Sequence, residues 1–453
     1  MECLTMKAAK LTLVLFSAIA AMANAAAAQQ LRQPLSIQTN SFNYFTTGTQ
    51  TTPSAVDVAV TACGCDEETT DECDTGGCDA APSCDSGCCA PSCGCGLNFN
   101  WCCLGDAWTL SDPAACIQIG GWSQGGYSSN EQPFSVDKGD GSSFNDATGN
   151  WNLHSMWVYA EKAAQTDGCC WDWGFRADVM YGTDSHKMQA FGNTEDANGA
   201  RGFDNDWDHG RYGWALPQIY GELAVGNLSV IAGHFFKIMG YEAVPAPENF
   251  FYSRGFTMFN AEPRTHTGVL ATYSANDHLT LYGGWTLGWD TGFDQFEDGN
   301  SFLGGFSVTN CCETMTFTYL CMAGDLGWRG DNGYNHSLVL DLTVTDRINY
   351  VIQSDLVETE EFNEDTSSIT QYLFYTVNDC VGLGARVEYF NDDFQGNGLG
   401  DVYQATFGVN IKPHANVVVR PEVRYNWNFP AGAGLPDNHS DLTVLGFDTI
   451  FSF

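Results

Sequence analysis

Three glutamates and four arginines are the residues of this sequence whose types and spacing best suit a chemical role. Glu242, Glu248 and Glu262 lie within the stretch 238–265, which lacks the periodicity of a strand. The arginines lie on segments of alternating apolar and polar residues and are Arg176, Arg386, Arg420 and Arg424. If the two sets faced each other across an opening, they would create a transverse field that orders passing polar solutes. The alternative is that the glutamates form ordinary salt bridges with arginines of their own stretch.

The stretch 238–265 is unusual in length and composition. It is longer than about 15 residues, beyond which a loop without secondary structure is usually functional or disordered. It is also apolar for a loop, with aromatic side chains at Phe250, Phe251, Tyr252, Phe256 and Phe259. We therefore expect it to fold inward and to narrow any opening at this place, because so many aromatic side chains are unfavourable in water.

Two further patterns resemble catalytic or metal-binding motifs but lack the context that those motifs need. A G-x-S-x-G pattern at 121–125 lies in an alternating segment with no helix after it. The aspartates at 204, 206 and 208 resemble the start of a calcium loop, but His209 and Ala215 replace its glycine and its bidentate glutamate. The sequence therefore predicts no catalytic residue, no metal site and no cofactor, and we do not expect an enzyme.

Composition and the N-terminal segment narrow the class of protein. The 453 residues include 18 Lys and Arg against 55 Asp and Glu, a net charge of −37. Such acidity argues against a nucleic-acid partner, which would require a basic face. Residues 1–28 have the order of a secretory signal peptide, with Lys7 and Lys10 before the apolar run 11–23 and small residues after it. We therefore expect an exported chain.

Cysteine is concentrated in the segment after the signal peptide. Nine of the 19 cysteines lie within 63–95, and Cys102 and Cys103 follow. In an exported chain such density most often indicates disulfides, although the C-G-C pairs at 63–65 and 93–95 leave a thiolate metal cluster as the less favoured alternative. Six more cysteines coincide with the start of the first expected strand or with expected short turns: Cys116, Cys169, Cys170, Cys311, Cys312 and Cys380. We predict disulfides among these six and with Cys102 or Cys103.

From residue 116 onward, alternation of apolar and polar residues recurs in segments of about ten residues. In 381–389, for example, Val381, Leu383 and Ala385 share one face, and Arg386 and Glu388 share the other. Period-2 alternation predicts strands with two different faces, and about ten residues is the length with which a tilted strand crosses a bilayer. We predict sixteen strands, at 116–128, 152–162, 171–182, 215–225, 228–237, 266–275, 278–288, 303–310, 313–324, 336–345, 347–357, 368–378, 380–390, 402–412, 416–426 and 442–453.

The connections between these strands alternate in length. Short ones at 226–227 and 276–277 alternate with long ones such as 183–214 and 238–265. Short periplasmic turns that alternate with long outer loops are typical of outer-membrane barrels. The chain also ends in Phe453 on a final alternating strand, which resembles the signal read by the barrel-assembly machinery. The fold class expected is therefore all-β, a closed antiparallel transmembrane β-barrel of about sixteen strands with a Cys-rich N-terminal extension.

Several segments resemble the OmpL-like β-barrel porin family, also called β-barrel porin-2, over roughly 115–453. They include G-G-W-S-Q-G-G-Y (120–127), L-P-Q-I-Y-G-E-L (216–223) and, most specifically, G-H-F-F-K-I-M-G-Y-E-A-V-P-A-P-E-N-F-F-Y-S (233–253). The resemblance implies an outer-membrane porin and carries no established catalytic residues.

These observations lead to one expected organisation and two expected functions. We predict a signal peptide at 1–28, a low-complexity periplasmic extension at 29–115 and a barrel at 116–453, with outer-membrane lipid around it. The favoured function is passive diffusion of small hydrophilic solutes or ions, and a homotrimer is the candidate assembly. The alternative is a structural or adhesive protein that is cross-linked through its Cys-rich extension.

Overall fold

The computed structural model describes residues 105–113, 115–129, 144, 149–166, 170–195, 201–393, 400–429 and 440–453. The predicted signal peptide, Cys169 and the part of the Cys-rich extension before Gly105 lie outside these residues. Within the described residues, no helix is long and apolar enough to span a membrane.

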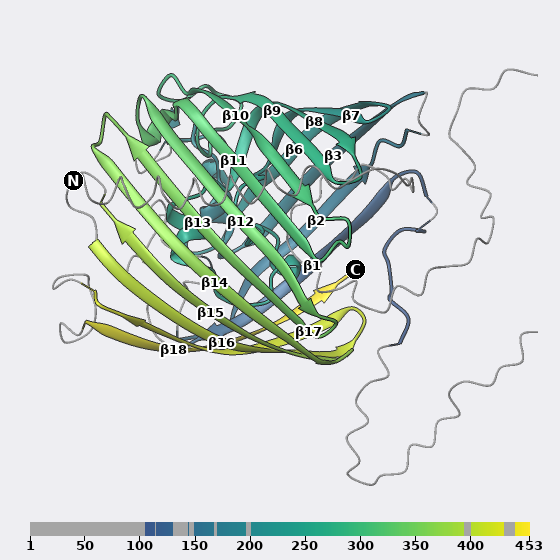
Figure 1. Ribbon diagram of the computed structural model, residues 1–453, viewed down its shortest axis with the longest axis vertical. Helices are drawn as coiled ribbons and strands as arrows, with labels where there is room; N and C mark the ends of the chain where they lie inside the picture. The colour runs from purple at the N-terminus through teal and green to yellow at the C-terminus, as the bar shows by residue number, and fades with distance from the viewer. Residues whose placement is uncertain are drawn as a thin grey trace, which may run out of the picture.

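Sixteen antiparallel strands form one closed barrel (Figure 1). Each barrel strand pairs with the barrel strands that precede and follow it in sequence, and the pairing of β1 with β18 closes the barrel. The sixteen predicted strands are confirmed. Their bounds are β1 (Gln118–Ser128), β2 (Asn152–Lys162), β3 (Trp171–Gly182), β6 (Gly213–Val225), β7 (Leu228–Phe236), β8 (Thr265–Asn276), β9 (Leu279–Thr286), β10 (Asn300–Thr309), β11 (Met315–Asp325), β12 (Gly333–Thr345), β13 (Ile348–Thr359), β14 (Glu364–Asn378), β15 (Val381–Asp392), β16 (Gly400–His414), β17 (Val417–Trp427) and β18 (Asp441–Ser452).

The strand faces differ as the alternation predicts. In β15 the apolar Leu383 and Val387 point outward and are 42% and 47% exposed, whereas Arg386 and Glu388, on the opposite face, are buried inside the barrel. Large exposed apolar side chains recur on the outer face, for example at Ile219, Leu223, Val269, Leu281, Phe302, Leu373, Phe407, Leu445 and Phe447. An apolar outer face and a polar interior are what a barrel in lipid requires.

The two ends of the barrel carry connections of different length. Turns at 226–227, 346–347 and 379–380 are short, and we call this end the short-turn rim. Long loops at the other end include 183–212, which contains α2 (Ser185–Met188), the hairpin of β4 (Thr194–Glu195) and β5 (Arg201–Gly202), and η1 (Asn205–Trp207). The strands predicted at 347–357 and 368–378 leave a long loop at 358–367, and this length is wrong. The strands β13 and β14 continue beyond these ends and leave only 360–363 between them.

Both ends of the described chain meet at the short-turn rim. Phe453 pairs with Gly121 of β1 through its backbone N–H and C=O, at 2.9 and 2.8 Å. Before β1, the backbone of Trp108 exchanges two hydrogen bonds with the side chain of Asn416 in the β16–β17 turn, at 2.8 and 2.6 Å. The Trp108 ring stacks on Phe451 with centroids 6.3 Å apart. The end of the N-terminal extension is therefore fixed across the last strand.

Candidate functional site: the loop inside the barrel

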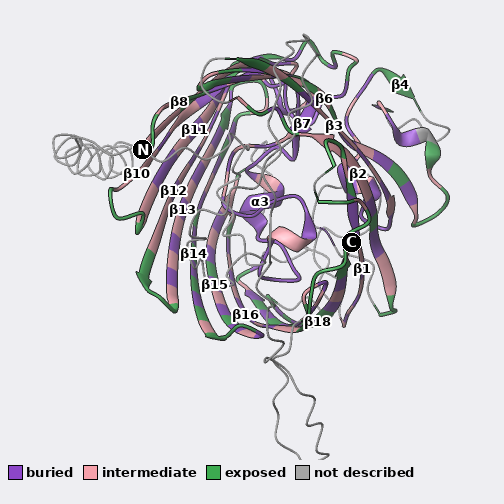
Figure 2. Ribbon diagram, turned by 90° about the vertical axis from the view of Figure 1, so that its right-hand side faces the viewer, coloured by how far each residue is buried: buried purple, intermediate pink, exposed green. Residues whose placement is uncertain are grey.

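The connection between β7 and β8, residues 237–264, folds into the barrel instead of extending from its end. It contains two short helices, η2 (Ala246–Glu248) and α3 (Phe256–Asn260). Figure 2, which looks into the barrel, shows α3 inside the ring of strands. We call this segment the inner loop.

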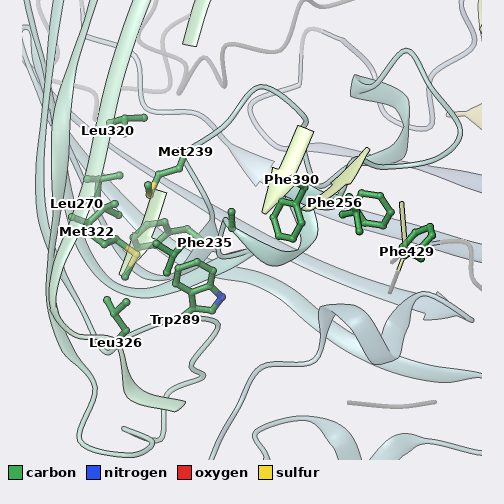
Figure 3. Close-up of a cluster of buried hydrophobic side chains, with 14 of the residues drawn as sticks. Phe235, Met239, Phe256, Leu270, Trp289, Leu320, Met322, Leu326, Phe390 and Phe429 are labelled. Atoms are coloured by element: carbon green, nitrogen blue, oxygen red, sulfur yellow. The ribbon is translucent and has the colours of Figure 1, made fainter. Parts of the chain in front are cut away.

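The inner loop contacts almost the whole circumference of the wall. It contributes to three buried apolar clusters, each against a different set of strands. Met239 and Phe256 join the largest cluster, with side chains of β7, β8, β10, β11, β13, β15, β16 and β18 (Figure 3). Val244 and Met258 pack with Trp122 of β1 and with β2, β3, β6, β17 and β18. The third cluster joins the inner loop to β12, β13 and β14. Where the inner loop meets the wall, the side chains pack as in a protein core.

Three consecutive aromatic residues of the inner loop lie against glycines of the wall. A methyl group on Gly384 would lie 2.4 Å from Phe250, one on Gly408 would lie 3.1 Å from Phe251, and one on Gly446 would lie 2.8 Å from Tyr252. In the strand register, Gly384 pairs with Gly408, Gly408 with Glu422, and Glu422 with Gly446. These four positions form one row across β15–β18, which we call the glycine row. The missing side chains allow the aromatic rings to approach the strand backbone.

Carboxylates of the wall hold the backbone of the inner loop. Glu388 of β15 accepts hydrogen bonds from the N–H groups of Phe256 and Thr257, which begin α3, at 2.9 and 2.7 Å. Glu422 of the glycine row accepts one from the N–H of Ser253 at 3.1 Å. Hydrogen bonds to charged acceptors are the stronger kind, so these contacts fix both the place and the orientation of the loop.

The predicted arginines of β15 and β17 lie beneath the inner loop. Arg386, Arg420 and Arg424 are 0%, 2% and 1% exposed. Arg386 forms an ion pair with Glu242 and donates to the Ser253 carbonyl at 3.0 Å. Arg420 pairs with Asp448 of β18 and donates to loop carbonyls, and Arg424 donates to the carbonyl of Arg254 at 3.5 Å. These guanidinium groups bind the loop to the wall.

This geometry differs from the predicted transverse field. Glu242 and Glu262 are 5% and 1% exposed, so they do not face an opening. Glu262 pairs with Lys237, which favours its charged form, but burial is the larger effect and raises the pKa of Glu262. Glu248 alone of the three is half-buried, and it lines a cavity of about 10 Å³ together with Tyr241 and Glu242. The physical reason is that an apolar loop packs onto the wall and brings the charges into direct pairs.

Arg176 lies apart from the other three predicted arginines, on β3. It donates to Glu161 at 2.6 Å and to Asp178 at 2.8 Å. Its guanidinium also lies 4.2 Å from the ring centroid of Tyr159. These partners come from β2 and β3, so Arg176 belongs to a charged group of the wall between the inner loop and the short-turn rim.

The predicted rim cysteines divide into two groups. Cys116 and Cys380 are disulfide-bonded, whereas Cys170, Cys311 and Cys312 are free thiols, as is Cys321 within β11. The prediction of disulfides is therefore wrong for Cys170, Cys311 and Cys312. Cys170 precedes β3 and the other two lie in the β10–β11 turn, five strand spacings of about 4.8 Å away. A disulfide requires Cα atoms within about 7 Å, so one rim turn cannot reach another at this separation.

Sequence reasoning missed the glycine row, although a signal was present. In 381–389, Gly382 and Gly384 occupy the otherwise polar face of the strand. A glycine inside a strand often marks the close approach of another backbone or ring. The inner-loop aromatics could have been matched to these positions only with knowledge of the strand register.

Comparisons with known proteins agree with this architecture. The sequence profile of the family described as β-barrel porin-2, OmpL-like, matches residues 116–453. The fold is similar to OprB of Pseudomonas putida, with 12% identity, 74% of this chain and 94% of that chain covered, and a TM-score of 0.51. It is also similar to the outer-membrane channel DcaP of Acinetobacter baumannii, with 12% identity, coverage of 74% and 97%, and a TM-score of 0.49. A search of curated proteins gave no match.

Proposed function

Because the chain belongs to the β-barrel porin-2, OmpL-like family, we propose that it is an outer-membrane porin for passive diffusion of small hydrophilic solutes or ions. The observation that carries the proposal is the inner loop packed across the interior of a sixteen-strand barrel. A loop of this kind reduces an otherwise wide barrel to a narrow passage. We expect transport without catalytic turnover.

The orientation in the membrane follows from the two kinds of connection. Short turns of bacterial barrels face the periplasm and long loops face outward. The segment that contains Trp108 lies on the short-turn rim, against Asn416. This contact supports a periplasmic location for the Cys-rich extension. Recognition of Phe453 by the barrel-assembly machinery and assembly as a homotrimer remain predictions, and sedimentation in detergent tests the second.

Single-channel recording tests the proposed function. The mature chain, refolded in detergent and added to a planar bilayer, is expected to give discrete current steps. The steps should be small for a sixteen-strand barrel, because the inner loop occupies much of the cross-section. Bilayers that contain folded protein but carry no current would contradict a channel and would favour the structural or adhesive alternative.

A further inference from the structure

The wall between the inner loop and the short-turn rim is more acidic than basic. Its inward-facing acids on β2, β3, β6 and β12, together with Glu248 of the inner loop, are Glu161, Asp172, Asp178, Glu222, Glu248 and Asp341. All of them except Asp178 are half-buried rather than buried. The described bases that face inward in the same region are Arg176 and Lys412, and Lys162 reaches Asp172 from the opposite face of β2. We call this region the vestibule.

Two of the vestibule acids are held by neutral donors. Glu222 accepts hydrogen bonds from the Ser229 hydroxyl at 2.6 Å and from the Ala164 N–H at 3.1 Å. Asp341 accepts one from the side-chain amide of Asn349 at 2.6 Å. None of these donors carries a positive charge that would offset the charge of a carboxylate. Glu161 and Asp172, in contrast, pair with Arg176 and Lys162.

The largest group of inward-facing bases is removed from any passage by the inner loop. Arg386, Arg420 and Arg424 are buried beneath it and hydrogen-bond to its backbone or to neighbouring carboxylates. Arg254 of the loop itself is 4% exposed. A charge that is buried and paired attracts a passing ion far less than one that borders water. Cation exclusion by an arginine wall is therefore absent from the described part of the lumen.

We propose that the passage prefers cations to anions, and that the vestibule carboxylates Glu222 and Asp341 are the main determinants of this preference. The inference rests on the proposed channel function and adds the class of permeant ion. Rings or walls of one sign of charge favour counter-ions in a narrow aqueous passage. At 0.1 M salt the screening length is about 10 Å, so a wall charge acts across much of such a passage.

A reversal-potential measurement tests the preference. The mature chain is placed in a planar bilayer between unequal KCl solutions, and the potential of zero current gives the permeability ratio of K⁺ to Cl⁻. We expect a ratio above one that falls toward one as KCl is raised from 0.1 to 1 M, because the screening length then shrinks to about 3 Å.

Charge-neutral variants identify the determinants. The double variant Glu222→Gln with Asp341→Asn is expected to lower the ratio about twofold or more, since it removes two wall charges while it keeps the side-chain shapes and one acceptor oxygen of each. Glu358→Gln is the matched control, because Glu358 lies on the outer face of β13 and is exposed. Heat-dependent gel mobility verifies that each variant is folded.

The outcomes separate the inference from the function on which it rests. Chloride preference in the unaltered chain, or a ratio that the double variant and the control change equally, would overturn the inference and leave the channel intact. Folded protein without current would overturn the channel function itself, and the inference with it.

Discussion

The contact between Gly384 and Phe250 gives a sharp test of how the inner loop is held. In Gly384→Ala, the new methyl carbon would lie 2.4 Å from the Phe250 ring. Carbon atoms in contact are about 3.5 Å apart or more, so the ring must move by about 1 Å. The ring has little room, because Phe251 and Phe374 have ring centroids 5.0 and 5.1 Å from it.

We expect Gly384→Ala to cost about 1–3 kcal/mol, the usual cost of overpacking a close-packed interior. The substitution should weaken docking of the inner loop rather than pairing of the strands, because the backbone hydrogen bonds of β15 are unchanged. Trypsin reports the docking, because Arg254 is 4% exposed inside the barrel and can be cut only when the loop is released. A cost of this size raises the released fraction about fivefold or more.

Gly221→Ala is the matched control, because a methyl group there meets nothing within 4 Å on the outer face of β6. The same glycine-to-alanine change should leave trypsin protection at Arg254 unaltered. Equal rates of cleavage in the two variants would refute the argument that the glycine row seats the loop.

Three other predictions concern charge, pH and thiols. Arg386→Met should destabilise the barrel by about 3–5 kcal/mol in urea unfolding, because Glu242 is left buried without its ionic partner. Adding Glu242→Gln should recover much of this loss. Burial raises the pKa of Asp204, in the loop 183–212, to about 6 from 3.8. Between these two pKa values the docked loop keeps a proton that the undocked loop loses. The free energy of loop docking, measured by hydrogen exchange, should therefore be greatest below pH 4 and fall by about 2–3 kcal/mol as the pH rises through 6. Asp204→Asn should abolish this pH dependence. Maleimide should label Cys311 without reductant and Cys380 only after reduction, whereas equal labelling of both would contradict the disulfide at Cys380.

The strands could be predicted because their signal is local. Every barrel strand alternates between residues that face lipid and residues that face inward, and each alternation can be read without knowledge of any other strand. Even the final strand, which ends at Ser452, is defined by its own sequence. Strand ends were predicted less well, as in β13 and β14. There the strands extend beyond the predicted ends, and residues near a connection alternate too weakly to mark where the strand stops.

The site could be predicted only in part, because its contacts join segments that are far apart in sequence. Alternation correctly places Arg386 and Arg420 on the inner face, and composition correctly indicates that the inner loop folds inward. The partners of these arginines depend on barrel closure and on how deeply the loop packs. Glu242 and Arg386 are 144 residues apart in sequence. Periodicity holds no information about whether such a pair meets directly or across water.

The position of Trp108 has a consequence for how the barrel closes. Its partners include Asn416 in the β16–β17 turn and Phe451 in β18, whereas its own segment leads into β1. The pairing of β1 with β18 closes the barrel beside these contacts. The contact of the indole with Phe451 therefore holds the start of the first strand beside the last strand and favours closure of the barrel.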